Sequence, residues 1–168
     1  MRLLDGLFAA AKVAAALFLA TICVLTLVTI AGRSLGYLLP IDAEMSGFSM
    51  AAATFLALAS TFRAGGHIRV GIFLRILPPR IRLAAELWSL GAAAVLVGYF
   101  GYATLVMVWD SFLLNDLSTG IIPVPLWIPQ ASMLIGIFLL EIALVEALIR
   151  SASTGIVQRD AEEQLLSE

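Results

Sequence analysis

Charged residues are scarce in this sequence. Asp, Glu, Lys and Arg make up 13% of its 168 residues, whereas 61% are hydrophobic and the mean hydropathy is +1.03. In a soluble domain about a quarter of the residues are charged. The composition therefore excludes an ordinary soluble domain and predicts a protein that crosses a membrane several times. The net charge of −2 gives no indication of a nucleic-acid partner, and we expect none.

Cysteine and histidine are almost absent, with one of each. A single cysteine, Cys23, cannot form a disulfide or a cysteine-based metal site within one chain, and it lies in an apolar run where a small buried side chain is expected. Haem between spanning helices needs ligands that project inward, and His67 at the membrane edge does not supply them. We interpret His67 as a loop histidine that hydrogen-bonds its surroundings.

Groupings of residues that carry catalysis are also lacking. The sequence has no Ser/His/Asp grouping and no paired inward carboxylates, and Gly65-Gly66 is too short to be a phosphate-binding loop. We therefore expect no catalytic, cofactor or metal site in this chain, and no enzyme.

Four long apolar runs make up most of the chain. The first is uncharged from Val13 to Gly32, too long for the roughly 7–15 apolar residues of a signal peptide. The fourth is expected to begin at Pro129, because a proline inside a helix removes a hydrogen bond. We expect an all-α membrane protein with a single four-helix membrane domain over residues 1–150 and a cytoplasmic tail over 151–168. The expected spans are about 7–30, 43–62, 87–109 and 129–149.

A basic stretch separates the second and third spans. It runs from Arg63 to Arg82 and holds five of the ten basic residues and the only histidine. Residues 68–77 are too few to span, so we expect a short amphipathic segment on the membrane surface with its arginines at the headgroups. Four spans place both termini on one side together with nine of the ten basic residues, and the other side has Arg33 alone. The positive-inside rule then predicts cytoplasmic N and C termini.

Two acidic residues are candidates for a function within the membrane. Glu141 lies about 13 Å before the end of the fourth span, where ionisable groups are usually functional. It either couples protons or contacts a partner helix, or it pairs with Arg63 or Lys12, and we favour the pairing. Glu44 is either an interface anchor or a charge that stabilises the start of the second helix, and both interpretations stay open.

The remaining candidates are basic residues and small residues. Arg63 and Arg69 either bind anionic lipid, fix a partner subunit, or simply anchor the chain at the headgroups. The second span is rich in Ala, Ser and Thr, which predicts that it packs against protein. In the third span Gly91, Ala94, Gly98 and Gly101 share one face, which predicts a close contact between helices. The first three spans have no charge at mid-depth and no internal proline, which argues against a transporter that works alone.

Several motifs resemble those of the small membrane subunit, the Q-type subunit, of tripartite ATP-independent periplasmic (TRAP) transporters. They are Glu44 at the start of the second span, Arg63-x-Gly-Gly-His67-Ile-Arg69-Val70, then Leu77-Pro78, and the segment from Ser118 to Pro129. The resemblance covers about residues 33–148. It departs from the family at Gly71, where an acidic residue is common.

The resemblance implies a location, partners and a role. It implies four spans with cytoplasmic termini in the bacterial inner membrane. It implies a large membrane subunit that holds the substrate and sodium sites, and a periplasmic binding protein that delivers an organic acid such as a dicarboxylate or sialic acid. Besides membrane lipids, these are the expected partners. The chain itself is expected to brace the large subunit, with Glu44, Arg63, His67, Arg69 and Glu141 as candidate contacts to that partner or to lipid.

Two other classes of protein remain as alternatives. A self-contained small multidrug exporter that acts as a homodimer also has four spans, but it relies on a carboxylate in its first helix, and residues 13–32 have none. A membrane redox subunit is disfavoured by the single histidine at the membrane edge.

Overall fold

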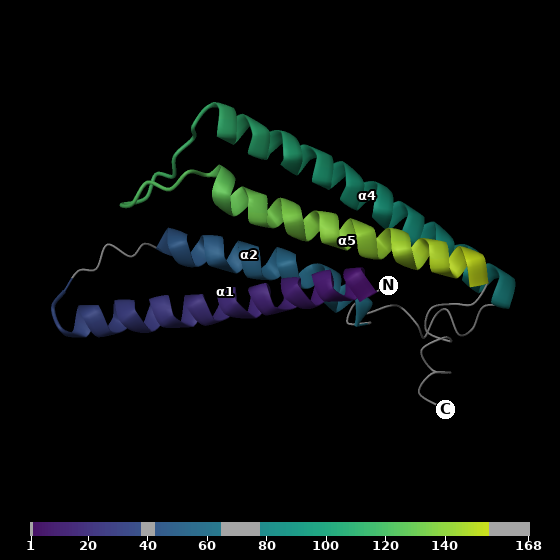
Figure 1. Ribbon diagram of the computed structural model, residues 1–168, viewed down its shortest axis with the longest axis horizontal. Helices are drawn as coiled ribbons and strands as arrows, with labels where there is room; N and C mark the ends of the chain where they lie inside the picture. The colour runs from purple at the N-terminus through teal and green to yellow at the C-terminus, as the bar shows by residue number, and fades with distance from the viewer. Residues whose placement is uncertain (1, 38–42, 65–77, 155–168) are drawn as a thin grey trace.

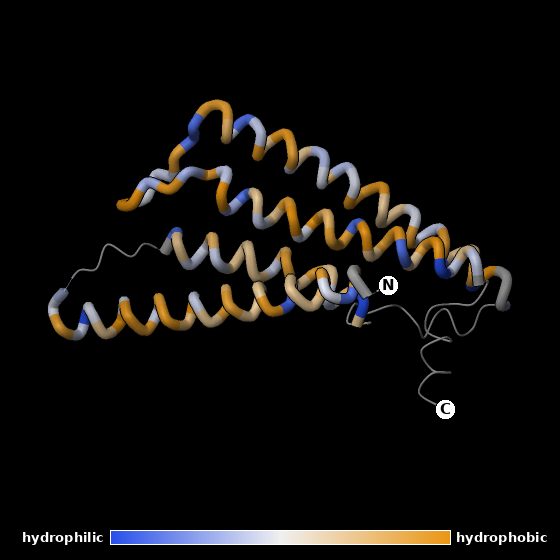
Figure 2. Tube along the Cα trace, in the orientation of Figure 1, coloured by the Kyte–Doolittle hydropathy of each residue, from blue (hydrophilic) through white to orange (hydrophobic). Residues whose placement is uncertain are grey.

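The computed structural model describes residues 2–37, 43–64 and 78–154. Within these ranges the chain forms four long helices, α1 (Arg2–Ser34), α2 (Ala43–Arg63), α4 (Pro79–Leu113) and α5 (Trp127–Thr154). Each is long and apolar enough to cross a membrane. Figure 2 shows the hydrophobic colour along most of each helix, with α2 paler than the others because of its small and polar residues. This confirms the all-α fold with four transmembrane helices.

The helices extend beyond the expected spans. α4 begins at Pro79, eight residues before the expected start of the third span at residue 87, and continues as one helix to Leu113. α5 begins at Trp127, two residues before Pro129. Proline is tolerated in the first turn of a helix, because its missing N–H would have no partner there. A span estimate counts only the residues that lipid covers, whereas backbone hydrogen bonding continues past them.

The four helices lie in a row, in the order α1, α2, α5, α4 (Figure 1). α2 packs on α1 and on α5, and α5 packs on α2 and on α4. The ring of Phe55 on α2 also stacks with that of Phe100 on α4, with 6.4 Å between the ring centroids. α1 and α4 are the outer helices. The start of α1 and the end of α5 lie at the same end of the molecule, as expected for alternating up and down helices.

The core follows the contact between α2 and α5. Half of its buried apolar residues on α2 and α5 are alanines, which lets the two backbones come close. Gly136 of α5 lies directly against the backbone of Phe55, and a Cβ at Gly136 would overlap its carbonyl group. α1 adds Phe8, Ala11 and Ala15 to the same cluster. The expected packing of the second span against protein is confirmed. The buried apolar residues of the two central helices are Ala52, Ala53, Leu56, Ala59, Phe62, Ile137, Leu139, Ala143, Leu144 and Ala147.

The small-residue face of α4 makes part of the expected contact. A Cβ at Gly101 would lie 3.3 Å from Cγ2 of Ile137 on α5, and one at Gly98 would lie 3.7 Å from Oε1 of Glu141. Gly91 faces open space instead. Gly98 and Gly101 therefore make the predicted contact, whereas Gly91 lies outside it.

Candidate functional site: polar contacts at the helix ends

Arg63, the last residue of α2, joins three helices. Its Nη2 donates to Oδ1 of Asp5 on α1 at 2.9 Å and to Oε1 of Glu146 on α5 at 3.5 Å. Its guanidinium also lies over the ring of Phe8, 4.5 Å from the centroid, which adds a cation–π attraction. All three contacts come from one side chain, so Arg63 fixes the ends of α1, α2 and α5 to each other. We name Arg63, Asp5, Phe8 and Glu146 the Arg63 clasp.

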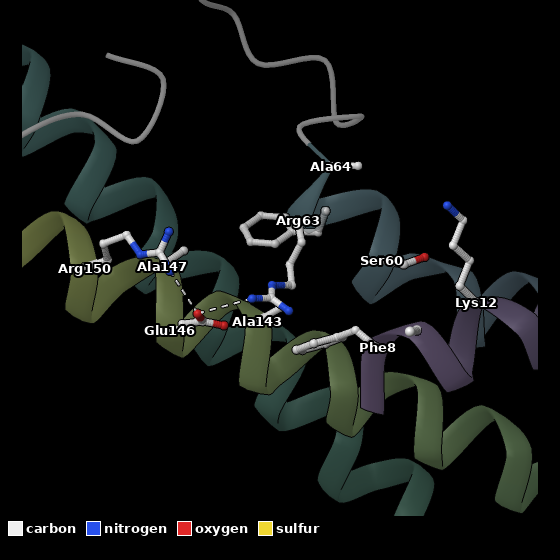
Figure 3. Close-up of a pocket in the computed structure, with 11 residues that line it drawn as sticks. Phe8, Lys12, Ser60, Arg63, Ala64, Ala143, Glu146, Ala147 and Arg150 are labelled. Carbon is white, nitrogen blue, oxygen red and sulfur yellow. Dashed lines mark hydrogen bonds and ion pairs between the residues drawn. The ribbon is translucent and has the colours of Figure 1, made fainter. Parts of the chain in front are cut away.

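A pocket of about 400 Å³ opens beside the clasp. Arg150 reaches the same Oε1 of Glu146 at 3.0 Å, one helical turn further along α5. Figure 3 shows Glu146 between Arg63 and Arg150, with Lys12 on the far side of the pocket. Phe8, Ala143 and Ala147 supply apolar wall.

The expected ion pair of Glu141 with Arg63 or Lys12 is wrong. Arg63 pairs with Asp5 and Glu146. Glu146 lies five residues beyond Glu141, which is about 7.5 Å further along the axis and about 140° around the helix. Glu146 therefore faces the end of α2, while Glu141 faces Gly98 on α4. Its Oε2 is buried and has no hydrogen-bond partner within the described part of the chain.

Glu44 holds the connection between α4 and α5. The hydroxyl of Ser118 donates to Oε2 of Glu44 at 3.1 Å and accepts from the N–H of Val124 at 3.2 Å. The N–H of Ser118 donates to the carbonyl of Val124 at 2.8 Å, which pairs the two arms of the connection. Glu44 is thus in the first turn of α2 and also the point where this connection is attached.

A further polar contact joins α4 and α5. The hydroxyl of Ser151 on α5 donates to Oε1 of Glu86 on α4 at 3.4 Å, and both side chains are buried. Sequence reasoning did not identify this contact. It also missed Asp5 and Glu146, although the spacing of four between Glu146 and Arg150 is the usual signal of an ion pair on a helix.

Some expected features lie outside the described residues. These are His67, Arg69, the amphipathic surface segment over residues 68–77 and most of the tail, of which the structure shows residues 151–154 as the end of α5. Across the ranges that are described, no group of three or more His, Cys, Asp or Glu side chains could hold a metal ion. The arrangement of cations, carboxylates and one ring can fasten helices together and attract an anion.

Comparison with known families assigns the chain. The model of the family described as tripartite ATP-independent periplasmic transporters, DctQ component, matches residues 22–154. The comparisons with curated proteins and with solved structures found no match. The family match confirms the resemblance seen in the sequence, and it includes the C-terminal part of α1 from residue 22 and all of α2, α4 and α5. With its four helices able to span a membrane, this chain belongs to the DctQ component family of TRAP transporters and is a small transmembrane permease subunit of the bacterial inner membrane.

Proposed function

We propose that this chain is the non-catalytic small subunit that braces the large membrane subunit of a sodium-driven TRAP transporter. The large subunit binds the cargo and the sodium ions. A periplasmic binding protein delivers the cargo, an organic acid.

The position of the charged groups along the helices carries this proposal. Lys12, Arg63 and Arg150 gather at one end of the molecule, around the pocket beside the clasp. The ionisable group deepest in the described spans is Glu141, an acid. An organic acid needs a cation or oriented donors at mid-depth, and a carboxylate there repels it. The cargo therefore crosses through another chain.

The fastening of the helices supports the bracing role. The Arg63 clasp fixes α1, α2 and α5 at one end, and Glu44 fixes the connection between α4 and α5 to α2 at the other. Between them, Gly136 brings α5 onto the backbone of α2. A subunit whose helices are tied at both ends and packed closely in the middle can resist the movements of a partner.

Glu141 is the contact to the large subunit that we propose within the membrane. A carboxyl group in the span whose Oε2 lacks a donor needs one, and a helix of the large subunit that carries a hydrogen-bond donor supplies it. Glu44, Arg63, His67 and Arg69 are proposed as contacts at the membrane surfaces, to the partner or to lipid.

Reconstitution tests the function. Proteoliposomes that contain this chain, the large subunit and the binding protein should take up an organic acid when a sodium gradient is applied. Vesicles that lack the large subunit should take up none. Sodium-dependent uptake by vesicles that hold this chain alone would refute the bracing role and favour a self-contained transporter.

The orientation is a separate part of the proposal, with both termini in the cytoplasm. A variant with Cys23→Ser removes the exposed free cysteine. In that background, a membrane-impermeant maleimide added outside spheroplasts should label Leu35→Cys and leave Ser153→Cys unlabelled, because these exposed positions lie at opposite ends of the molecule. The reverse pattern would show that the termini are periplasmic.

A further inference from the structure

The pocket beside the Arg63 clasp has two kinds of lining. Its apolar wall is Phe8 on α1 with Ala143 and Ala147 on α5. Its polar lining includes three cations, and each comes from a different helix: Lys12 from α1, Arg63 from α2 and Arg150 from α5. An apolar wall beside a group of cations is suited to a molecule with an anionic head and an apolar body.

The three cations of the pocket differ in their ion pairs within the described residues: Arg63 and Arg150 have carboxylate partners and Lys12 has none. Glu146 is the only carboxylate among the described lining residues, and both arginines use its Oε1. Asp5 approaches Arg63 at 2.9 Å without lining the pocket. Within the described part of the chain, these side chains are three cations and two carboxylates, and Arg150 makes a further interaction besides its pair with Glu146. Lys12 makes no ion pair with a carboxylate of the described residues, so its ammonium is the charge that most needs an anion.

The pocket also lies at the right depth for a lipid. It is formed where α2 ends, at Arg63 and Ala64, and about one to three turns before the end of α5. The long apolar stem of a lysine lets Lys12 place its charge at the headgroups while its backbone stays in the span. Large apolar side chains of α1 next to it, such as Leu7 and Val13, are exposed. Acyl chains can lie along this surface.

From these observations we propose that the pocket binds a phosphate ester, the headgroup of an acidic phospholipid. Lys12 and Arg150 contact the phosphate oxygens, Arg63 contributes its charge while it stays in the clasp, and the first part of an acyl chain lies against Phe8. Basic pockets between transmembrane helices are common sites for anionic headgroups. The site is formed by this chain alone, so it does not depend on the proposed transport role.

Native mass spectrometry of the purified full chain in mild detergent tests the site. The probes are phosphatidylglycerol, phosphatidylcholine and inorganic phosphate. Phosphatidylglycerol should bind more tightly than phosphatidylcholine. Lys12→Gln should weaken phosphatidylglycerol about fivefold, the effect of about one basic residue near an anionic headgroup. Lys12→Arg should keep the affinity. Arg33→Gln is the matched control, because it removes one positive charge from the other end of α1, and it should bind like the wild type.

Each other outcome overturns a part of the proposal. Equal binding of the two lipids, or equal losses in Lys12→Gln and Arg33→Gln, would show that there is no headgroup site. Binding of inorganic phosphate that depends on Lys12, without any preference for phosphatidylglycerol, would overturn the lipid as the source of the phosphate.

Discussion

The close contact between Gly136 of α5 and the backbone of Phe55 on α2 should make Gly136 sensitive to substitution. Gly136→Ala places a methyl group where α5 meets the backbone of Phe55 on α2. The added Cβ overlaps the carbonyl group of Phe55 and lies 2.8 Å from its Cβ. Backbone atoms cannot rotate away as the end of a side chain can. The helices must therefore move apart.

The size of the effect follows from this overlap. To bring the separation of the two Cβ atoms from 2.8 Å to an ordinary 3.4 Å, α5 must shift by at least 0.6 Å. A gap of this size forfeits roughly a quarter or more of the dispersion energy across the contact. Overpacked sites lose about 1–3 kcal/mol. A loss of about 2 kcal/mol lowers the melting temperature of a chain of this size by about 4–8 °C.

Gly91→Ala is the matched control. A Cβ at Gly91 meets no atom within 4 Å, so alanine adds only its better helix propensity, up to about 1 kcal/mol. Its melting temperature should be equal to or above that of the wild type. Gly101→Ala should fall between the two, because its neighbour at 3.3 Å is a side-chain methyl of Ile137 that can move.

The assay is thermal unfolding of the purified variants in the same detergent, followed by circular dichroism. The reasoning depends on the order of the variants, with Gly136→Ala lowest. If Gly136→Ala melted at or above the temperature of Gly91→Ala, the close contact between α2 and α5 would not exist.

Three further predictions concern polar groups. Arg63→Gln should lower the melting temperature by a few degrees, because it removes partly exposed contacts that together contribute about 1–2 kcal/mol, whereas Arg33→Gln should not change it. Ser118→Ala should cost about 1 kcal/mol and increase hydrogen exchange over residues 114–126; no increase beyond that of the exposed neighbour Thr119→Ala would contradict the attachment of this connection to α2. Glu141→Gln should weaken co-purification with the large subunit and leave the sodium dependence of uptake unchanged; the opposite pattern would assign Glu141 to ion coupling.

The sequence predicts where the helices lie along the chain better than it predicts which helices pack against each other. Long uncharged runs mark the four spans, because lipid requires them. These helices are apolar on nearly all sides, so no hydrophobic face shows which helix packs on which. The row in which α5 lies between α2 and α4 could not be read from the pattern. The glycines of the third span predicted part of this arrangement, because Gly98 and Gly101 do face α5.

The sequence indicates which polar residues can make contacts between helices, but it does not indicate which residues they contact. Arg63 was a candidate, and it does join helices, yet its partners Asp5 and Glu146 lie 58 and 83 residues away in the chain. No local spacing shows a pair at such a distance. The sequence favours a pair of Glu141 with Arg63 or Lys12, because all three lie toward the same end of the membrane. The rotation between Glu141 and Glu146 around α5 decided which of them reaches α2.

The row of helices also sets the order in which the protein is assembled. α1 and α2 leave the ribosome first and can pair in the membrane at once, whereas α4 packs chiefly on a helix that has not yet been translated. α5 is synthesised last among the four, and it joins the early pair to α4. A nascent chain that stops before Trp127 thus has the hairpin of α1 and α2 and a helix, α4, that lacks its main packing partner.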